Sequence, residues 1–367
     1  AIHVYREGEI LKKRICFCID TLGRGGAERV MSNLANEFAK DKYEVYFVCN
    51  RHAEKEYELN SEIKNIFLCD ELRLSSYNCL AKIQQMLFLR RFLHRNHIDI
   101  GIAFMGGNNF ALLAATLFTN IKRIISIRNS PEKEYPTILH KILYSLLFPT
   151  ASRIVFQTTE EKIYFNKKIQ DLGTIIYNPI SDRFYHNDKS QRGKNIVSVG
   201  RLVPQKNQKM LIDAFYSIQD EYPDIILEIY GDGYLRTELE KYVKQLGMTN
   251  RIYLRNSVID IEKYINRASM FVMTSKNEGM PNALMEAMAL GLPVISTDCA
   301  GGGPRELIKH QNNGLLVQNK QELIESMKEI LSNPARGEIL GRNAQLSATN
   351  FHERKVYSIW KKLIEEI

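Results

Sequence analysis

The sequence predicts an α/β protein built from two doubly wound parallel sheets, each in its own domain. The chain has 367 residues, which exceeds the usual size of one domain and is enough for two ordinary cores. Short apolar runs alternate with helical patterns in both halves of the chain, and this alternation is typical of parallel sheets. The chain turns polar after residues 177–182 and stays polar to residue 194. We therefore expect an N-terminal domain at residues 1–180 and a C-terminal domain at residues 181–350.

A glycine-rich turn joins the first predicted strand to the first predicted helix. Residues 15–19 are apolar, Gly25 and Gly26 follow, and an amphipathic pattern continues to Lys40. Such a turn leaves backbone N–H groups at a helix N-terminus, where they can bind an anion. The spacing is not Gly-x-Gly-x-x-Gly, and no acidic residue follows at the dinucleotide distance. The sequence therefore disfavours nicotinamide binding.

Cysteine use indicates a reducing compartment. Most of the six cysteines lie in apolar runs, and we expect Cys16 and Cys18, in the first strand, to face opposite sides of the sheet. No Cys-x-x-Cys pair, histidine cluster or Asp-x-Asp triplet suggests a metal site. Residues 1–14 are mixed and charged, and no apolar run reaches membrane-spanning length. We therefore expect a cytoplasmic protein without a signal peptide.

Positive charge is concentrated in residues 72–153, called the basic region below. It holds eleven Lys or Arg residues and three acids, in a chain whose formal net charge is +8. Within it, residues 84–95 and 138–148 mix cations with large apolar residues. Such helices either lie on an anionic membrane surface or pack into the core with a basic outer face, and the sequence leaves both open. Nucleic acid is not expected as a partner, because no aromatic-basic interleaving is present.

The C-terminal half carries two cations after its first strand. Residues 196–199 form a buried run that leads into a loop with Arg201 and Lys206. An arginine can donate two parallel hydrogen bonds to phosphate oxygens and a lysine adds a movable charge, so the pair suits a diphosphate. A solvated basic loop is the alternative interpretation.

The next two predicted strands end in loops of small and polar residues. Residues 226–230 are followed by Gly231 and Gly233, and residues 252–254 lead to a loop that contains Asn256. Glycines let another chain or a nucleotide approach the backbone closely. A Gly-x-Gly sequence alone usually means only a turn.

Glu278 and Glu286 form the most informative pattern in the chain. Glu278 follows an apolar run at residues 268–275, and Glu286 lies on an Ala/Leu/Met-rich helix that precedes another strand at residues 294–297. In such a βαβ unit, ligands bind at the carboxyl ends of the strands. The connecting loop offers backbone N–H groups to an anion, and the carboxylates can accept bonds from sugar hydroxyls. The residues of this connecting loop are Gly279, Met280, Pro281 and Asn282. Two glutamates eight apart also occur by chance in many helices.

Residues 277–286 resemble the Glu-x7-Glu motif of retaining glycosyltransferases of family 4, which have the GT-B fold of two Rossmann-like domains facing a cleft. The blocks at residues 23–30, 196–207 and 226–233 are similar to this family in the same order, as is the loop at residues 299–306. The resemblance spans most of the chain. It implies that a C-terminal helix at residues 351–367 completes the N-terminal domain. The residues expected on its packed face are Val356, Ile359, Trp360, Leu363 and Ile367.

The resemblance also implies the chemistry: transfer from a UDP-sugar with retention at the anomeric carbon, without a metal or cofactor. Arg201 and Lys206, with the N–H groups of residues 279–282, are implied to stabilise the leaving diphosphate. Glu278 is implied to face the donor sugar and Glu286 to bind the ribose. By the same resemblance, the residues near the nucleotide or the donor phosphates are Gly25, Gly26, Gly231, Gly233 and Asn256.

One departure from the family lies in the N-terminal domain, where many relatives carry a histidine that this sequence lacks. Arg128 and Asn129 occupy the corresponding loop and are implied to bond the donor sugar or the acceptor. Pairing of Arg128 within its own loop is an equally good interpretation. Asn108 and Asn109 follow another strand and either meet the sugar or form a turn.

The basic region and the similarity to one subgroup of the family predict the acceptor. We expect transfer of an N-acetylhexosamine to a polyprenyl-diphosphate-linked saccharide in bacterial surface-glycan assembly, such as that of O-antigen. The enzyme would then be peripheral, on the cytosolic face of the inner membrane. Two alternatives stay open: a non-hydrolysing UDP-sugar epimerase of the same fold, and a non-catalytic membrane- or glycan-binding protein.

Overall fold

The computed structural model describes residues 13–23, 25–41, 43–54, 56–72, 79–186 and 192–367, with the backbone alone of residues 79–80, β1 (Tyr5–Arg6) and β2 (Glu9–Ile10). The chain packs into two compact units. Unit 1 contains Ala1–Tyr177 and Tyr357–Ile367, and unit 2 contains Asn178–Val356. Arg24 of the glycine-rich turn, Arg73 of the basic region and residues 187–191 of the polar stretch lie outside the described residues.

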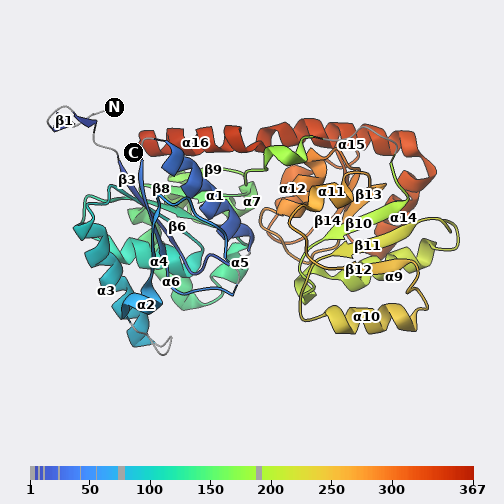
Figure 1. The fold of residues 1–367 in the computed structure, drawn as a ribbon, viewed down its shortest axis with the longest axis horizontal. Helices are drawn as coiled ribbons and strands as arrows, with labels where there is room; N and C mark the ends of the chain where they lie inside the picture. The colour runs from blue at the N-terminus through green and yellow to red at the C-terminus, as the bar shows by residue number, and fades with distance from the viewer. Residues whose placement is uncertain are drawn as a thin grey trace. The chain divides into compact units, whose positions relative to one another are not determined.

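Unit 1 is built on a seven-stranded parallel sheet in the order β5-β4-β3-β6-β7-β8-β9. Figure 1 labels β3, β6, β8 and β9 of this sheet. Every residue of β6 (Ile100–Phe104) is buried, as expected for a parallel strand covered on both faces. The other strands are β3 (Arg14–Ile19), β4 (Glu44–Cys49), β5 (Lys64–Phe67), β7 (Lys122–Ser126), β8 (Arg153–Phe156) and β9 (Gly173–Ile175). The helices are α1 (Gly26–Lys40), α2 (Leu68–Leu72), α3 (Cys79–Arg95), α4 (Gly106–Ala115), α5 (Pro131–Glu134), α6 (Ile138–Leu147), η1 (Phe148–Thr150), α7 (Thr159–Ile163) and α8 (Lys167–Asp171).

Unit 2 is built on a six-stranded parallel sheet in the order β12-β11-β10-β13-β14-β15. Its strands are β10 (Asn195–Val199), β11 (Ile226–Tyr230), β12 (Ile252–Arg255), β13 (Met270–Met273), β14 (Val294–Thr297) and β15 (Leu315–Val317). Its helices are η2 (Asp182–Phe184), η3 (Pro204–Lys206), α9 (Gln208–Ile218), α10 (Arg236–Gln245), α11 (Ile261–Ile265), α12 (Asn282–Ala289), α13 (Gly303–Leu307), α14 (Lys320–Ser332), α15 (Pro334–Ala348) and η4 (Thr349–Phe351). The prediction of two parallel α/β sheets is confirmed.

Each sheet has one point where the strand order reverses. In unit 2 the chain adds β11 and β12 on one side of β10 and then places β13 on the other side. In unit 1 the reversal lies between β3 and β6. Loops that leave such neighbouring strands run in opposite directions and open a crevice at the carboxyl end of the sheet, where ligands bind in folds of this kind.

The last helix, α16 (Glu353–Glu365), begins in unit 2 and ends in unit 1. Trp360 is buried, and its ring centroid lies 5.9 Å from that of Phe104 in β6. The packed face differs from the predicted one, because Ile359 is exposed and Ile364 is fully buried. At 100° per residue, Ile364 falls on the side of Trp360, whereas Ile359 falls at the margin of the apolar stripe.

The prediction for Cys16 and Cys18 is wrong. Their Sγ atoms lie 3.9 Å apart inside the core of unit 1. Side chains two residues apart along a strand share one face of the sheet, since the pleat repeats every two residues.

Candidate active site

Lys206 and Glu278 meet at the switch point of unit 2. Lys206 ends the short helix that follows β10, and Glu278 lies on the loop that follows β13. The Lys206 Nζ atom donates a short hydrogen bond to Glu278 Oε1, and both side chains are largely buried. The Lys206 stem lies over Gly200, where an added Cβ would be 3.5 Å from Cδ and Cε. The topology thus places a cation and a carboxylate, 72 residues apart in sequence, at the expected ligand site.

Hydrogen bonds join the loops that carry these two residues. Thr274 Oγ1 donates to the backbone oxygens of Lys206 and Asn207 at 3.1 and 3.0 Å. Gln205 Nε2 donates to the Asn277 oxygen at 2.9 Å, and the Lys276 N–H donates to the Gln205 oxygen at 2.8 Å. These contacts hold the position of one loop relative to the other.

The loop after β11 packs against the loop that carries Arg201. Gly231 has φ +152°, and an added Cβ would lie 2.0 Å from the Gly200 oxygen. At Gly233 an added Cβ would lie 2.3 Å from the Leu202 oxygen. Both glycines are therefore required by close backbone packing beside the switch point. Arg201, which follows β10 at the carboxyl end of the sheet, has an exposed side chain.

The N-terminus of α12 faces the same region. Its N-cap is Pro281, whose side chain cannot accept a bond from the first turn, so the helix offers backbone N–H groups and the positive end of its dipole. Asn178 Nδ2 donates to the Met280 oxygen at 3.3 Å and to Asn282 Oδ1 at 2.7 Å. From the sequence, Asn178 was assigned no role in the site, and its asparagine-proline sequence gave no signal of this contact.

The remaining predicted residues of unit 2 lie on the same edge of the sheet or one turn into α12. Glu286 is 5% exposed on α12, one turn after Asn282. Asn256 is exposed on the loop after β12. The roles assigned to these side chains remain predictions.

A loop that begins with Ala300 lies behind Glu278. The Glu278 N–H donates to the Ala300 oxygen at 2.9 Å. Gly301 has φ +92°, and an added Cβ would lie 2.2 Å from the Glu278 oxygen. At Gly303 an added Cβ would lie 1.6 Å from the Gly279 oxygen and 2.7 Å from Pro281 Cδ. The loop can hold residues 278–281 in place only because these positions have no side chain.

Gly303→Ala is therefore expected to displace the Gly279–Pro281 backbone and to weaken binding of a donor nucleotide by tenfold or more. Overpacking at a rigid backbone contact costs about 1–3 kcal/mol, and the amides at α12 would leave their positions. Calorimetric titration with the nucleotide would measure the effect. Gly107→Ala is the matched control, because an added Cβ there meets nothing within 4 Å. Wild-type affinity in Gly303→Ala would contradict the prediction.

In unit 1, Gly25 and Gly26 lie at the N-terminus of α1 as predicted from the sequence. Gly25 is the N-cap of α1, and an added Cβ there would lie 2.1 Å from Glu28 Oε2. The Glu28 carboxylate thus folds back onto the helix N-terminus, where negative charge is favourable.

Arg128 follows β7 and is held among aromatic and acidic groups of unit 1. Its guanidinium carbon lies 3.6 Å from the centroid of the Phe104 ring. Burial lowers the pKa of Arg128 to about 9, while Glu161 and Glu134 act in the opposite direction. Asn109 Nδ2 donates to the Ser126 oxygen at 2.9 Å, and Asn108 Oδ1 accepts from Asn50 Nδ2 at 3.0 Å.

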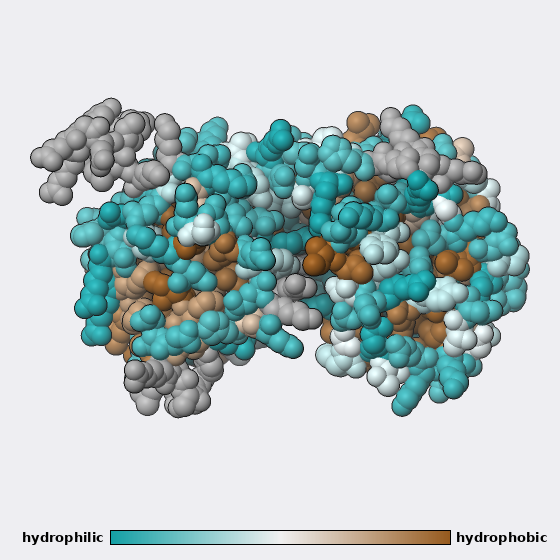
Figure 2. Space-filling view, viewed as in Figure 1, coloured by the Kyte–Doolittle hydropathy of each residue, from teal (hydrophilic) through white to brown (hydrophobic). Residues whose placement is uncertain are grey.

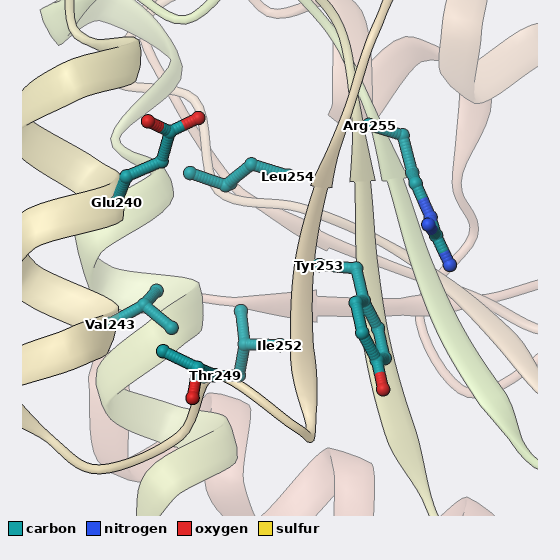
Figure 3. Close-up of a pocket in the computed structure, with 7 residues that line it drawn as sticks. All are labelled: Glu240, Val243, Thr249, Ile252, Tyr253, Leu254 and Arg255. Atoms are coloured by element: carbon teal, nitrogen blue, oxygen red, sulfur yellow. The ribbon is translucent and has the colours of Figure 1, made fainter.

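A small pocket of about 200 Å³ lies between α10 and the edge strand β12 (Figure 3). Val243 of α10 faces Ile252 of the strand and Leu254 extends toward Glu240, whereas the Arg255 side chain points away on the other side. None of the predicted site residues lines it.

The described residues also contain one group of potential metal ligands that the sequence analysis missed. His52, Cys69 and Asp70 bring their ligand atoms within 4.8 Å of one another. His52 Nε2 lies 2.9 Å from Asp70 Oδ2, and this carboxylate raises the pKa of His52. The exposed ion pair accounts for the grouping, which arises where the loop after β4 meets the start of α2.

Comparisons with known proteins agree with this geometry. The family model "Glycosyltransferase Family 4" matches residues 24–184, and the model "Glycosyl transferases group 1" matches residues 182–347. Both describe glycosyltransferases, which favours transfer over the two alternatives left open by the sequence.

Two curated relatives come from Campylobacter jejuni subsp. jejuni. N-acetylgalactosamine-N,N'-diacetylbacillosaminyl-diphospho-undecaprenol 4-alpha-N-acetylgalactosaminyltransferase is 29% identical, over 92% of this chain and 95% of its own length. The second relative is GalNAc-alpha-(1->4)-GalNAc-alpha-(1->3)-diNAcBac-PP-undecaprenol alpha-1,4-N-acetyl-D-galactosaminyltransferase. It is 27% identical, over 96% of this chain and 99% of its own length.

A solved structure confirms the GT-B fold. Anabaena HepE in complex with UDP has a TM-score of 0.80 and 17% identity, over 97% of this chain and 100% of that one. The two family models together cover most of the sequence, from residue 24 to residue 347. The chain therefore belongs to glycosyltransferase family 4.

Proposed function

We propose that this glycosyltransferase moves a sugar from a UDP-sugar to a polyprenyl-diphosphate-linked saccharide in bacterial surface-glycan assembly, with retention at the anomeric carbon. The observation that carries the proposal is the Lys206–Glu278 pair at the switch point, beside the N-terminus of α12. The names of the two Campylobacter relatives support an N-acetylhexosamine as the donor sugar and an undecaprenol-linked acceptor. UDP bound to Anabaena HepE supports the choice of nucleotide.

The arrangement suits stabilisation of a leaving diphosphate. Arg201 and Lys206 supply two positive charges, and the backbone N–H groups of Gly279, Met280 and Asn282 add donors at a helix N-terminus. Glu278 accepts hydrogen bonds from donor-sugar hydroxyls, and Glu286 accepts those of the ribose. Preorganised groups of this kind stabilise charge as it develops, without reorganisation at the moment of reaction.

Retention follows if the acceptor attacks from the face that the diphosphate leaves. The bond between the anomeric carbon and the diphosphate oxygen breaks, and the acceptor oxygen bonds to the same face of that carbon. The acceptor proton passes to the departing diphosphate oxygen, so the protein supplies no nucleophile. Because Arg201, Lys206 and the α12 amides neutralise the diphosphate, we propose that neither a divalent cation nor another cofactor is required. EDTA is then expected to leave the transfer rate unchanged.

The test is calorimetric titration of the protein with UDP, GDP, ADP and a panel of their sugars, followed by transfer assays with a polyprenyl-diphosphate-linked saccharide. Selective binding of UDP-sugars and an α-linked product from an α-linked donor would support the proposal. Binding of none of the nucleotides would overturn it.

We also propose that unit 1 docks on an anionic membrane surface through the outer face of α6. Four large apolar residues of this helix are 51–73% exposed: Ile138, Leu139, Ile142 and Leu146. Lys141, also exposed, lies among them. Figure 2 shows apolar surface in the part of unit 1 where Figure 1 labels α4 and α6. An apolar face flanked by cations is typical of helices that lie in a membrane interface.

The other candidate helix, α3, exposes less apolar surface than α6, since its Ile83 and Leu87 are 46% and 44% exposed. Leu89 and Leu93 are buried, while Arg91 and Arg95 are exposed. None of the helices within the described residues is both long and apolar enough to span a bilayer. The proposed membrane contact is therefore assigned to α6.

Replacing Leu139 and Leu146 together by glutamate is expected to weaken binding to anionic liposomes by tenfold or more at low salt. Burial of a leucine side chain contributes about 1.5–3 kcal/mol, and each glutamate adds repulsion from an anionic surface. Co-sedimentation would measure the effect. Leu346→Glu is the matched control, because Leu346 is equally exposed on α15 of unit 2. Equal losses in the two variants would count against the role of α6.

A further inference from the structure

A buried cluster of charges lies directly behind Arg128 in unit 1. The guanidinium packs over the Phe104 ring, and Phe104 is in turn packed against Trp360 of α16. Two acids, Glu134 at the end of α5 and Glu161 on α7, interact electrostatically with the guanidinium. One cation and two acids therefore share a site from which most water is excluded.

Glu134 joins the loops that follow two neighbouring strands. Its carboxylate interacts with the backbone N–H groups of Gly106, after β6, and of Arg128 and Asn129, after β7. The Tyr135 hydroxyl donates to Glu134 Oε1 at 3.2 Å. The acid lies close against Gly106, where an added Cβ would be 3.3 Å from Glu134 Cγ. Glu134 thus ties the backbone beside Arg128 to the start of α4.

Glu161 closes the cluster from the next strand. It is 0% exposed, and the Gln157 N–H, just after β8, donates to its Oε2 at 2.7 Å. Its other oxygen, Oε1, is buried and has no hydrogen-bond partner. A fully buried acid with one unsatisfied oxygen is costly, since a polar group loses its hydration on burial. A simple N-terminal cap on α7 would not require this burial.

We propose that Glu134 and Glu161 are positioning residues, which fix the Arg128 guanidinium for contact with the reacting sugars. The proposal deepens the proposed function and rests on it, because Arg128 must contact donor sugar or acceptor for its position to matter. Neither acid touches substrate in this scheme. Each acts through Arg128 and its loop.

The charges of the cluster are coupled. Burial raises the pKa of Glu134 to about 7 and that of Glu161 to about 8, and the negative charge of Glu134 adds to the rise at Glu161. At neutral pH at least one of the two carboxyls therefore keeps a proton, while Arg128 stays charged. The nearby groups that face the cluster from other elements are Asn109 of α4 and Tyr135.

A double-mutant cycle tests the proposal. Glu134→Gln and Glu161→Gln are each expected to lower kcat about 10- to 100-fold with little change in the KM of the UDP-sugar, because small misplacements of a contact group have effects of this size. In an Arg128→Ala background the same substitutions are expected to have no further effect on kcat. Equal losses in both backgrounds would show a merely structural role and overturn the proposal.

Two matched controls lie beside the acids. Glu132→Gln changes an exposed acid of α5, and Glu160→Gln changes the neighbour of Glu161 on α7. Both are expected to keep wild-type kcat. A loss in either control equal to that in Glu134→Gln and Glu161→Gln would also count against the proposal.

A second measurement does not depend on transfer. Carboxyl ¹³C NMR of glutamate-labelled protein is expected to show two carboxyls that titrate near neutral pH, one of which disappears in Glu161→Gln. The Glu161 titration should move to higher pH in Arg128→Ala, which removes the favourable charge. Titration of both acids below pH 5, as for ordinary glutamates, would contradict the proposed coupling of the two carboxyls with Arg128. A cluster that titrates as expected in a protein without transfer activity would overturn the proposed function instead.

Discussion

Replacing Lys206 by alanine is expected to lower kcat/KM for the UDP-sugar by about 10²–10³-fold, the usual loss when one preorganised stabilising group is removed. Lys206 is the cation that the switch point of unit 2 holds in a largely buried position. A charge there acts through less solvent than a charge on the exposed Arg201, so its interaction with a diphosphate is screened less. Transfer kinetics would measure the loss of kcat/KM, and calorimetry with UDP would measure how much of it is lost nucleotide affinity.

Lys209→Ala is the matched control for this experiment. Lys209 lies three residues later, with an exposed side chain over the Tyr242 ring, and its removal is expected to leave donor affinity unchanged. Lys206→Ala also leaves Glu278 without its cation, so the melting temperature of each variant must be compared. A folded Lys206→Ala variant with wild-type kcat/KM would refute the assignment of the donor site.

The meeting of Lys206 and Glu278 could be anticipated from local patterns. Each residue follows a short buried strand, and the carboxyl ends of parallel strands lie at one edge of the sheet. The family resemblance then fixed which loops mattered. What the sequence did not contain was the strand order, which places β10 directly beside β13.

The residues that hold the loops were not predictable in the same way. Thr274 and Asn178 each act through two hydrogen bonds to backbone or side-chain atoms distant in sequence. Glu161, three residues after Thr158, follows the pattern of an exposed helix cap, and nothing local shows that α7 would be packed with this acid inside. For α6 the sequence left a membrane surface and the core both open, and only the structure shows which of its apolar residues are exposed.

Glu278→Gln is expected to lower kcat by about 10²-fold while leaving the affinity for UDP unchanged or higher. The substitution keeps the shape of the side chain but removes the negative charge that pairs with Lys206. In the absence of donor, that ion pair competes with the diphosphate for the lysine, so its loss frees Lys206 for UDP. The donor sugar, however, loses a charged acceptor for its hydroxyls, and hydrogen bonds to charged groups contribute about 1.5–3 kcal/mol.

The opposite directions of these two effects separate a catalytic role of Glu278 from a structural one. If Glu278 only held Lys206 in place, the Gln variant would bind UDP and UDP-sugar more weakly by the same factor. If it contacts the sugar, the ratio of UDP-sugar to UDP affinity falls while UDP binding holds. Glu329→Gln, which breaks the ion pair with Arg336 on the outer helices of unit 2, controls for loss of a glutamate charge and is expected to change neither affinity. Because Glu278 and Lys206 pair in the free protein, the switch point is held in shape before a donor arrives, and the proposed function requires the donor diphosphate to take the place of the carboxylate at the lysine.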